Sequence, residues 1–337
     1  MPAFHQASVA SVISARPGLT RVRLADGSRA YALTDLTGPV AVGDDVVVNT
    51  TAVDLDLGSG GWHVVHWNLT GGDWSEPGPG HLMKLRYTSL QIDTGAGEED
   101  GDVPMELDAA PVVAAGVHSQ LPLVVAAVAS ERPGTRVVYV MTDGAALPLA
   151  LSDTVAALVD RGLLAGTVTA GHAFGGDVEA LNVASALTLA RHRLGAEVIV
   201  VAMGPGGAGT GSRLGYTALE VAPALDAAAW LGGRPIACLR CSSADPRRRH
   251  QGISHHSTTA LDAVRSDVDV AVPPGVDPLP SGRHRWHSID PGDPGELLAA
   301  FDLNVTSMGR APGDDSIYFA APAAAGVLAA RLVVTGP

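Results

Sequence analysis

From residue 111 onward, apolar runs alternate along the chain with stretches of mixed polarity. The runs are rich in β-branched residues and have the length of buried strands, whereas the stretches between them repeat apolar residues at helical spacing. The pattern predicts strands over 135–141, 165–170, 197–203, 234–241 and 268–274, helices over 148–162, 177–195, 216–233 and 256–267, and a closing helix or strand over 322–334. Repeated strand–helix–strand units indicate a doubly wound α/β domain, with a mostly parallel sheet and helices on both faces.

The first part of the chain has a different pattern. Residues 1–92 contain short β-rich runs, and Asp26-Gly27 stands between two of them as a hairpin signal. Several short strands predict a small β-barrel or sandwich-like domain. Residues 93–110 are acidic and rich in glycine, which is typical of a linker or an exposed loop. The α/β domain then spans residues 111–337.

Charge and composition exclude several classes of partner. The net charge of −13 argues against nucleic acid and against an anionic membrane, because both require a basic face. No apolar stretch is long enough to cross a bilayer, and the first residues lack the pattern of a signal peptide. The two cysteines fit a reducing cytoplasm. A homo-oligomer is compatible with the sequence, which does not determine the oligomeric state.

Lysine usage excludes some cofactors. Lys84 is the only lysine, and the glycine-rich loop has Arg213 where a Walker A loop has its lysine. A pyridoxal phosphate enzyme needs a Schiff-base lysine beside a phosphate cup, and the surroundings of Lys84 show none. We expect Lys84 to be a solvated surface residue. The sequence therefore names no cofactor.

In a doubly wound sheet, ligands bind beyond the carboxyl ends of the strands. Four loops that follow predicted strands, at 142–144, 171–177, 204–212 and 242–257, are rich in glycine, aspartate, histidine, serine or arginine. Because these ends share one edge of the sheet, we expect the site to be built from these loops. The alternative is that each loop is only a polar connection.

The loop "GPGGAGTGS" follows a strand and has its first glycines in G-x-G-x-x-G spacing. The strand after it ends without the acidic residue that a dinucleotide fold uses, so a dinucleotide site is weakly supported. The segment "GGAGTGS" resembles the phosphate loop of the tubulin and FtsZ family, but over this loop alone. The loop is either an anion cradle or a packing turn. The predicted anion-binding residues are Gly204, Gly206, Gly207, Gly209, Thr210, Gly211, Ser212, Arg213, Arg247, Arg249 and Ser254.

Four residues are candidates for acid–base catalysis. Asp143 ends a strand, and His172, His255 and His256 lie in loops of the same predicted edge. The alternatives are an Asp-Gly turn and structural histidines. His250, His255 and His256 together with Asp245 are chemically suited to a metal, but neither H-E-x-x-H nor His-x-His spacing occurs, so no metal site is predicted.

Several longer motifs point to one family. The segments "HLMKLRYTSLQ", "DGAALPLALSD", "GHAFGGD", "GPGGAGTGSRLGY" and "ADPRRRHQGISHHSTTAL" resemble the bacterial domain-of-unknown-function family 3866 over most of the chain. The resemblance implies no activity, ligand or functional residue. From the residues we expect a protein that binds a small anion or a phosphorylated metabolite, either as an enzyme or as a non-catalytic binding or regulatory protein. In a third alternative, a purely structural role, the glycine loop and the histidines only pack.

Overall fold

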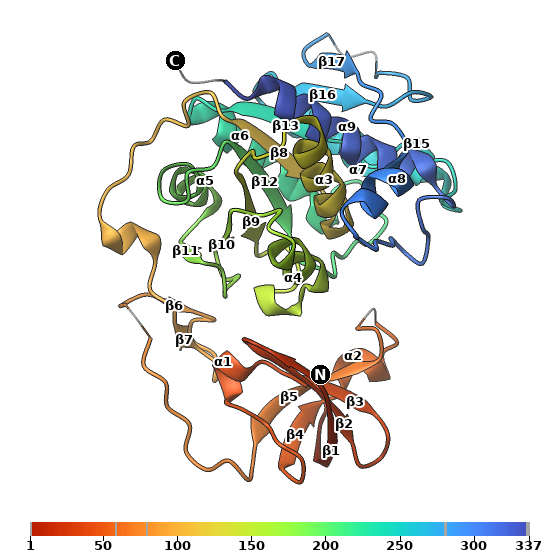
Figure 1. Ribbon diagram of the computed structural model, residues 1–337. Coiled ribbons are helices and arrows are strands. Elements are labelled where there is room, and N and C mark those ends of the chain that lie inside the picture. The colour runs from red at the N-terminus through yellow and green to blue at the C-terminus, as the bar shows by residue number, and fades with distance from the viewer. Residues whose placement is uncertain (1, 58, 79, 280–281, 335–337) are drawn as a thin grey trace. The chain divides into compact units, whose positions relative to one another are not determined.

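The computed structural model describes residues 2–57, 59–78, 80–279 and 282–334. It divides into two compact units, residues 1–95 and residues 96–337 (Figure 1). Because no helix of the described residues combines the length and the hydropathy that a bilayer crossing requires, none is a candidate membrane span.

The first unit contains a closed barrel with the strand order β1-β2-β3-β5-β4 and a separate two-stranded sheet of β6 and β7. Strand β3 pairs with β5 in parallel, and the other neighbouring pairs are antiparallel. Gly27 has a φ of +88°, as the predicted turn between β2 and β3 requires. The barrel is thus the small β-domain that the sequence predicts. The elements are β1 (Phe4–Arg16), β2 (Leu19–Leu24), β3 (Arg29–Ala32), α1 (Thr34–Thr37), β4 (Asp45–Asn49), α2 (Thr51–Asp54), β5 (Trp62–Asn68), β6 (Met83–Lys84) and β7 (Ile92–Asp93).

One expectation about residues 84–110, the solvated Lys84, is wrong. Lys84 is 4% exposed, so it is a buried lysine and not a solvated one. Residues 96–110 group with the second unit, where Leu107 is fully buried in a hydrophobic core and the carboxylate of Glu98 accepts a hydrogen bond from the amide of Leu181. The predicted linker therefore packs on the α/β unit from residue 96 onward.

The second unit is built on an eight-stranded parallel sheet in the order β11-β10-β9-β12-β8-β13-β16-β17. Neighbouring residues of the central strands face opposite cores: Val113 lies in one hydrophobic cluster, and Val112 and Ala114 lie in the other. The strands are β8 (Pro111–Ala115), β9 (Val137–Thr142), β10 (Gly166–Ala170), β11 (Val178–Ala180), β12 (Val198–Met203), β13 (Arg234–Cys238), β16 (Asp269–Val272) and β17 (Arg285–Ser288), with the short pair β14 (Cys241–Ser242) and β15 (Gly252–Ile253) outside the sheet.

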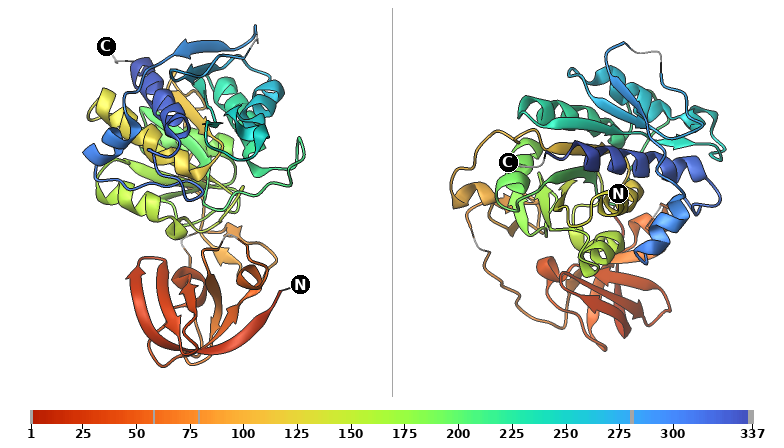
Figure 2. Two further views of the ribbon diagram at one scale, coloured as in Figure 1. Left: turned by 90° about the vertical axis from the view of Figure 1, so that its right-hand side faces the viewer. Right: turned by 45° about the horizontal axis from the view of Figure 1, so that its top comes forward.

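Helices cover both faces of this sheet, which confirms the predicted α/β architecture (Figure 2). Helices α3 and α9 pack together on one face, and α6 and α7 lie on the other (Figures 1 and 2). The α-helices are α3 (Leu121–Glu131), α4 (Asp153–Asp160), α5 (Val183–His192), α6 (Val221–Trp230), α7 (His255–Ala263), α8 (Pro294–Ala300) and α9 (Ser316–Leu332), and the 3-10 turns are η1 (Gly97–Asp100), η2 (His118–Gln120), η3 (Leu149–Leu151), η4 (Thr217–Glu220) and η5 (Arg248–His250).

The side toward which the chain adds its next strand changes at the centre of the sheet. From β8 the chain passes through α3 to β9, whereas from the adjacent strand β12 it passes through α6 to β13 on the other side. Helices α3 and α6 lie on opposite faces of the sheet. This arrangement is a topological switch point, where open α/β sheets hold their ligands. The fold therefore directs attention to the carboxyl ends of β8, β12 and β13.

Candidate functional site

A buried glutamine ties the loops of the switch point together. Gln120 is fully buried, and its Oε1 accepts hydrogen bonds from the amides of Gly116 and Val117, just after β8. Its Nε2 donates to the carbonyl of Leu239, just after β13, at 2.7 Å. This one side chain thus links the segments that follow these two paired strands.

The glycine loop after β12 folds into a short hairpin. The amide of Thr210 donates to the carbonyl of Gly215, and the amide of Thr217 donates to the carbonyl of Ala208. The helix that the sequence predicts over 216–233 starts as the 3-10 turn η4 at Thr217 and becomes α-helical only at Val221. Because these amides bind within the hairpin, the loop does not open into a helix N-terminus as a P-loop does.

Within the hairpin, hydroxyls also bind locally. Thr210 Oγ1 donates to the carbonyl of Gly215, and Ser212 Oγ accepts from the amide of Gly215. Gly204 is buried, and a Cβ there would lie 2.5 Å from the carbonyl oxygen of Ala146, so this glycine serves close packing of the backbone. Gly206, Gly207 and Gly209 are exposed along the hairpin. Of the predicted loop residues, Gly211 and Arg213 reach the hollow described below.

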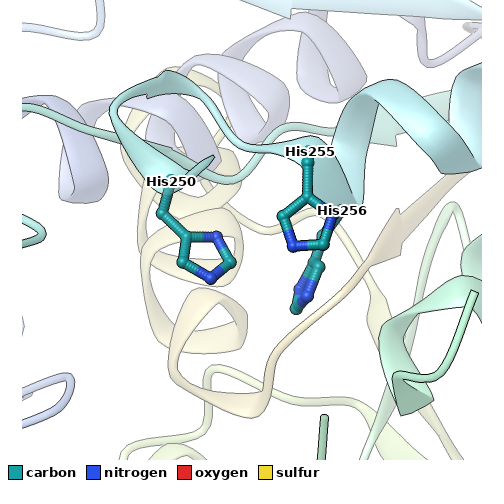
Figure 3. Close-up of side chains that lie close together, drawn as sticks. All are labelled: His250, His255 and His256. Carbon is teal, nitrogen blue, oxygen red and sulfur yellow. The ribbon is translucent and has the colours of Figure 1, made fainter. Parts of the chain in front are cut away.

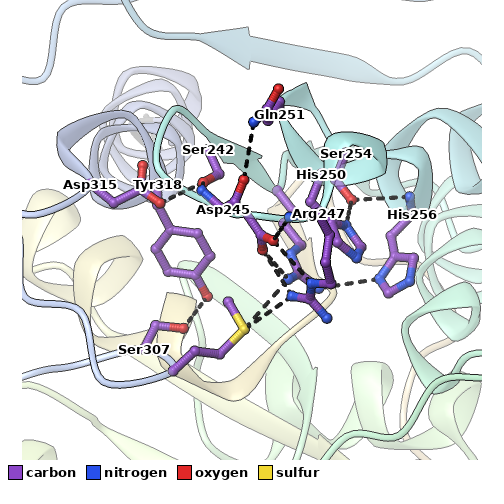
Figure 4. A network of polar contacts seen from close by, with 12 residues as sticks. Ser242, Asp245, Arg247, His250, Gln251, Ser254, His256, Ser307, Asp315 and Tyr318 are labelled. Atoms are coloured by element: carbon purple, nitrogen blue, oxygen red, sulfur yellow. Dashed lines mark hydrogen bonds and ion pairs between the residues drawn. The ribbon is translucent and has the colours of Figure 1, made fainter. Parts of the chain in front are cut away.

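The loop after β13 is organised by a buried carboxylate. Asp245 is 1% exposed, and Arg247 donates to it through Nε at 2.9 Å and Nη2 at 2.8 Å (Figure 4). The hydrogen bonds from Arg247 hold the pKa of the Asp245 carboxyl well below its usual range. Arg240 and Arg310 lie 3.5 and 3.7 Å from the same carboxylate. Arg247 is therefore a structural partner of Asp245.

A second carboxylate extends this cluster. Asp315, 1% exposed, accepts a hydrogen bond from Ser242 Oγ at 2.5 Å and lies 3.4 Å from Arg310 Nε. The Tyr318 hydroxyl lies close by and bonds with Ser307 Oγ at 2.8 Å (Figure 4). Three guanidinium groups face two carboxylates here. Within the described part of the chain, Nε of Arg240 and both Nε and Nη2 of Arg310 are buried without a hydrogen-bond acceptor. The cluster thus has an excess of positive charge.

A surface hollow of about 550 Å³ forms where the glycine hairpin meets the loop after β13. The residues that line it are Gly211, Arg213, Arg248, Arg249, Gln251, Ile253, His255, Thr258, Thr259 and Asp262. Its three arginines and one aspartate give a formal charge of +2. Gly211 has a φ of +82°, and a Cβ there would lie 3.5 Å from Nη1 of Arg249. The structure thus brings the predicted residues Gly211, Arg213, Arg249 and His255 together.

Three histidines cluster at the start of α7 (Figure 3). One nitrogen of each ring of His250, His255 and His256 lies within 4.8 Å of the others. Burial, reinforced by nearby arginines, lowers the pKa of His250 to about 4 and that of His256 to about 3, so both rings are neutral at neutral pH. Neutral imidazoles can hold a transition metal.

Ser254, which the sequence predicts as an anion ligand, has a different role. It is fully buried, and its Oγ accepts from the amide of His256 as the N-cap of α7. The same oxygen bonds with His250 Nδ1 at 2.7 Å (Figure 4). The hydroxyl is therefore committed to the fold and does not line the hollow.

Asp143 and His172 form a separate group at the end of β9. The Asp143 carboxylate accepts from the backbone amide of His172 at 3.0 Å. Glu220 lies beside Asp143 and accepts a hydrogen bond from Thr142 Oγ1 at 2.5 Å. Burial, together with the negative charge of Asp143, raises the pKa of Glu220 to about 7. Asp143, His172 and Glu220 are not among the residues that line the hollow.

Sequence reasoning did not find Glu220, Arg240, Arg310 or Asp315. Arg310 and Asp315 follow the last strand and carry no motif, and Glu220 reads as one polar position of an amphipathic helix. The position of Arg240, two residues past the end of β13, is the one signal that was available. The catalytic roles of Asp143, His172, His255 and His256 stay predictions.

Comparison with known proteins adds a family but no chemistry. The model of a family described as protein of unknown function (DUF3866) matches residues 29–326, which is most of the chain. Neither a curated protein nor a solved structure matches the chain. The description of the family gives no activity, ligand or cofactor.

Proposed function

Because the chain belongs to this family of unknown function, its activity must be argued from its own residues, and we propose that it binds a small phosphorylated or otherwise anionic metabolite at the carboxyl edge of the α/β sheet. The ligand would lie in the hollow between the glycine hairpin and the loop after β13. The observation that carries the proposal is the charge of this hollow, +2 on a chain whose net charge is −13. A local basic surface on an acidic protein favours a small anion over a large polyanion.

The chemistry of the lining supports an anionic ligand. Arg248 and Arg249 are exposed, and the side chain of Arg213 is 75% exposed, so guanidinium donors are open to a ligand. Arginine can hold a phosphate or carboxylate with two parallel hydrogen bonds. Arg213 is 3.4 Å from Asp262, and an exposed pair of this kind is weak, so an incoming anion can compete for the arginine.

The test is calorimetric titration of the full chain with inorganic phosphate and with glycerol 3-phosphate. Each of Arg249→Gln and Arg213→Gln should weaken binding about tenfold, since a charge-assisted hydrogen bond contributes about 1.5–3 kcal/mol. Arg265→Gln is the matched control, because Arg265 is exposed beyond the other end of α7 and does not line the hollow. If Arg249→Gln and Arg213→Gln bind phosphate as tightly as Arg265→Gln, or if the native chain does not bind it, the hollow is rejected as the site.

A second candidate function is an enzyme that acts on a small anionic substrate at the separate group of Asp143, His172 and Glu220, and it is favoured by Glu220. A carboxyl group whose pKa is raised to about 7 can give and take a proton near neutral pH. Product analysis with a panel of phosphomonoesters should then show turnover that Glu220→Gln abolishes. Turnover that survives this substitution would exclude Glu220 from the reaction.

The same ligand class fits a cytoplasmic protein. Both cysteines, Cys238 and Cys241, are buried and unpaired. Free thiols are typical of reducing compartments, in which phosphorylated metabolites also occur. Measuring where a tagged full chain resides in its native cell would test this placement, and secretion of the protein would contradict it.

A further inference from the structure

We propose that His250, His255 and His256 form a binding site for one borderline divalent transition-metal ion, with Zn²⁺ as the representative. The three residues belong to η5 and to the first turn of α7. The proposal does not depend on anion binding, because the three imidazole rings can hold a metal whether or not the hollow holds an anion. It goes beyond the sequence, whose spacing of histidines predicts no metal site.

The rings already have the spacing of a metal centre. The ring centres lie 4.4 Å apart for His255 and His256, 4.9 Å for His250 and His256, and 5.0 Å for His250 and His255. In a tetrahedral zinc site with Zn–N bonds of about 2.1 Å, the imidazole centres are about 5 Å apart. The ligand nitrogens, now within 4.8 Å of one another, would need to close by rotation of the rings.

Neighbouring groups hold two of the rings in place. His250 Nδ1 is bonded to Ser254 Oγ, and when Nδ1 carries the proton, Nε2 has the free lone pair that a metal needs. The ring of Tyr216 stacks on His256 with centres 3.8 Å apart and planes 4° apart. Metal-binding histidines are commonly oriented by such outer contacts.

His255 supplies the observation that packing alone does not explain. Its Nε2 is buried and has no hydrogen-bond partner among the residues that the structure describes. A buried polar atom without a partner costs about 1–3 kcal/mol. Three imidazoles packed against one another without a ligand would leave this cost unrelieved. A metal bound to Nε2 removes it.

The charges around the cluster influence which metal complex forms. Arg240 donates to His256 Nδ1 at 3.4 Å, so metal binding by this ring requires the guanidinium to turn away, and Arg249 and Arg247 also lie near the histidines. These cations disfavour a bare dication, whereas Asp245 offsets part of their charge. Three histidines leave a fourth position on a tetrahedral metal for water or an anion. Since His255 also lines the basic hollow, that position opens toward an anion-binding surface.

The experiment is titration of the full chain with Zn²⁺ in competition with a chromophoric chelator, and with Co²⁺ as a spectroscopic probe. The expected result is one ion per chain and the visible absorption bands of tetrahedral Co²⁺. His255→Ala and His256→Ala should each weaken Zn²⁺ binding at least tenfold. His192→Ala is the control, because this histidine of the same unit lies in the last turn of α5 and bonds to the carbonyl of Glu106.

Thermal unfolding without metal shows whether each variant folds. If only one of His255→Ala and His256→Ala folds, that variant alone is sufficient for the test. Weaker binding in the site variants with unchanged binding in the control supports the site. Absence of stoichiometric binding in the native chain overturns it. Equal affinities in the native chain and in a folded site variant also overturn it, because the ion would then bind elsewhere.

Discussion

Replacing Glu220 by glutamine should change how the stability of the protein depends on pH. Glu220 is half-buried and bonded to Thr142, and its pKa is raised from 4.5 to about 7, mainly by burial. Because the native pKa lies above the unfolded value, the folded protein keeps a proton that the unfolded chain has lost. The resulting stability is fully present below about pH 4.5 and is lost as the pH rises to about 7.

The magnitude follows from the difference between the two pKa values. A rise from 4.5 to about 7 corresponds to at most about 3 kcal/mol of unfolding free energy. Glutamine has nearly the same shape, can still accept the hydrogen bond from Thr142 and does not ionise. The variant should therefore gain stability relative to the native chain as the pH rises, by up to about this amount between pH 5 and pH 8.

The assay is urea unfolding of the native chain and of Glu220→Gln, followed by circular dichroism at several pH values in this range. Contributions of the barrel unit are common to both proteins and cancel in the difference. Glu296→Gln is the control, because Glu296 is exposed in the first turn of α8. If the free energies of the native chain and Glu220→Gln run parallel from pH 5 to pH 8, the reasoning about Glu220 is refuted.

Two further predictions concern packing and coupling. Gly144→Ala should destabilise the α/β unit by about 1 kcal/mol, because a Cβ there would push the Glu220 carboxylate out of its hydrogen bond with Thr142, whereas Gly313→Ala should be nearly neutral; equal thermal midpoints would contradict this. Zn²⁺ and glycerol 3-phosphate should each strengthen binding of the other by the same factor, since His255 belongs to both sites, and calorimetry that finds independent binding would exclude such coupling.

Five strands of the sheet, β9, β10, β12, β13 and β16, could be predicted because they differ in hydrophobic period from the helices between them, whereas the central strand β8 and the edge strands β11 and β17 were not predicted. Helix α3 escaped prediction because eight of its eleven residues are buried, between the sheet and α9, so it has little amphipathic pattern. The segment 177–195 was predicted as one helix, yet it begins with the edge strand β11. Asp177 accepts from Thr167, and this bond to the neighbouring strand β10 is tertiary information that periodicity does not contain.

The candidate site was only partly predictable for a similar reason. Loops at strand ends are visible in the sequence, so Gly211, Arg213 and Arg249 were identified and are now found in one hollow. Residues whose properties arise from partners far away in the sequence were not identified. Glu220 owes its raised pKa to burial beside Thr142 and Asp143, and Arg310 reaches Asp245 across 65 positions of sequence.

The central claim is that the basic hollow at the switch point holds a small anion, and a crystal structure of the full chain grown with glycerol 3-phosphate tests it most directly. The account predicts phosphate density against Gly211, with guanidinium nitrogens of Arg213 and Arg249 within about 3 Å of its oxygens. Phosphate bound elsewhere on the chain, with only solvent between these residues, would contradict the account.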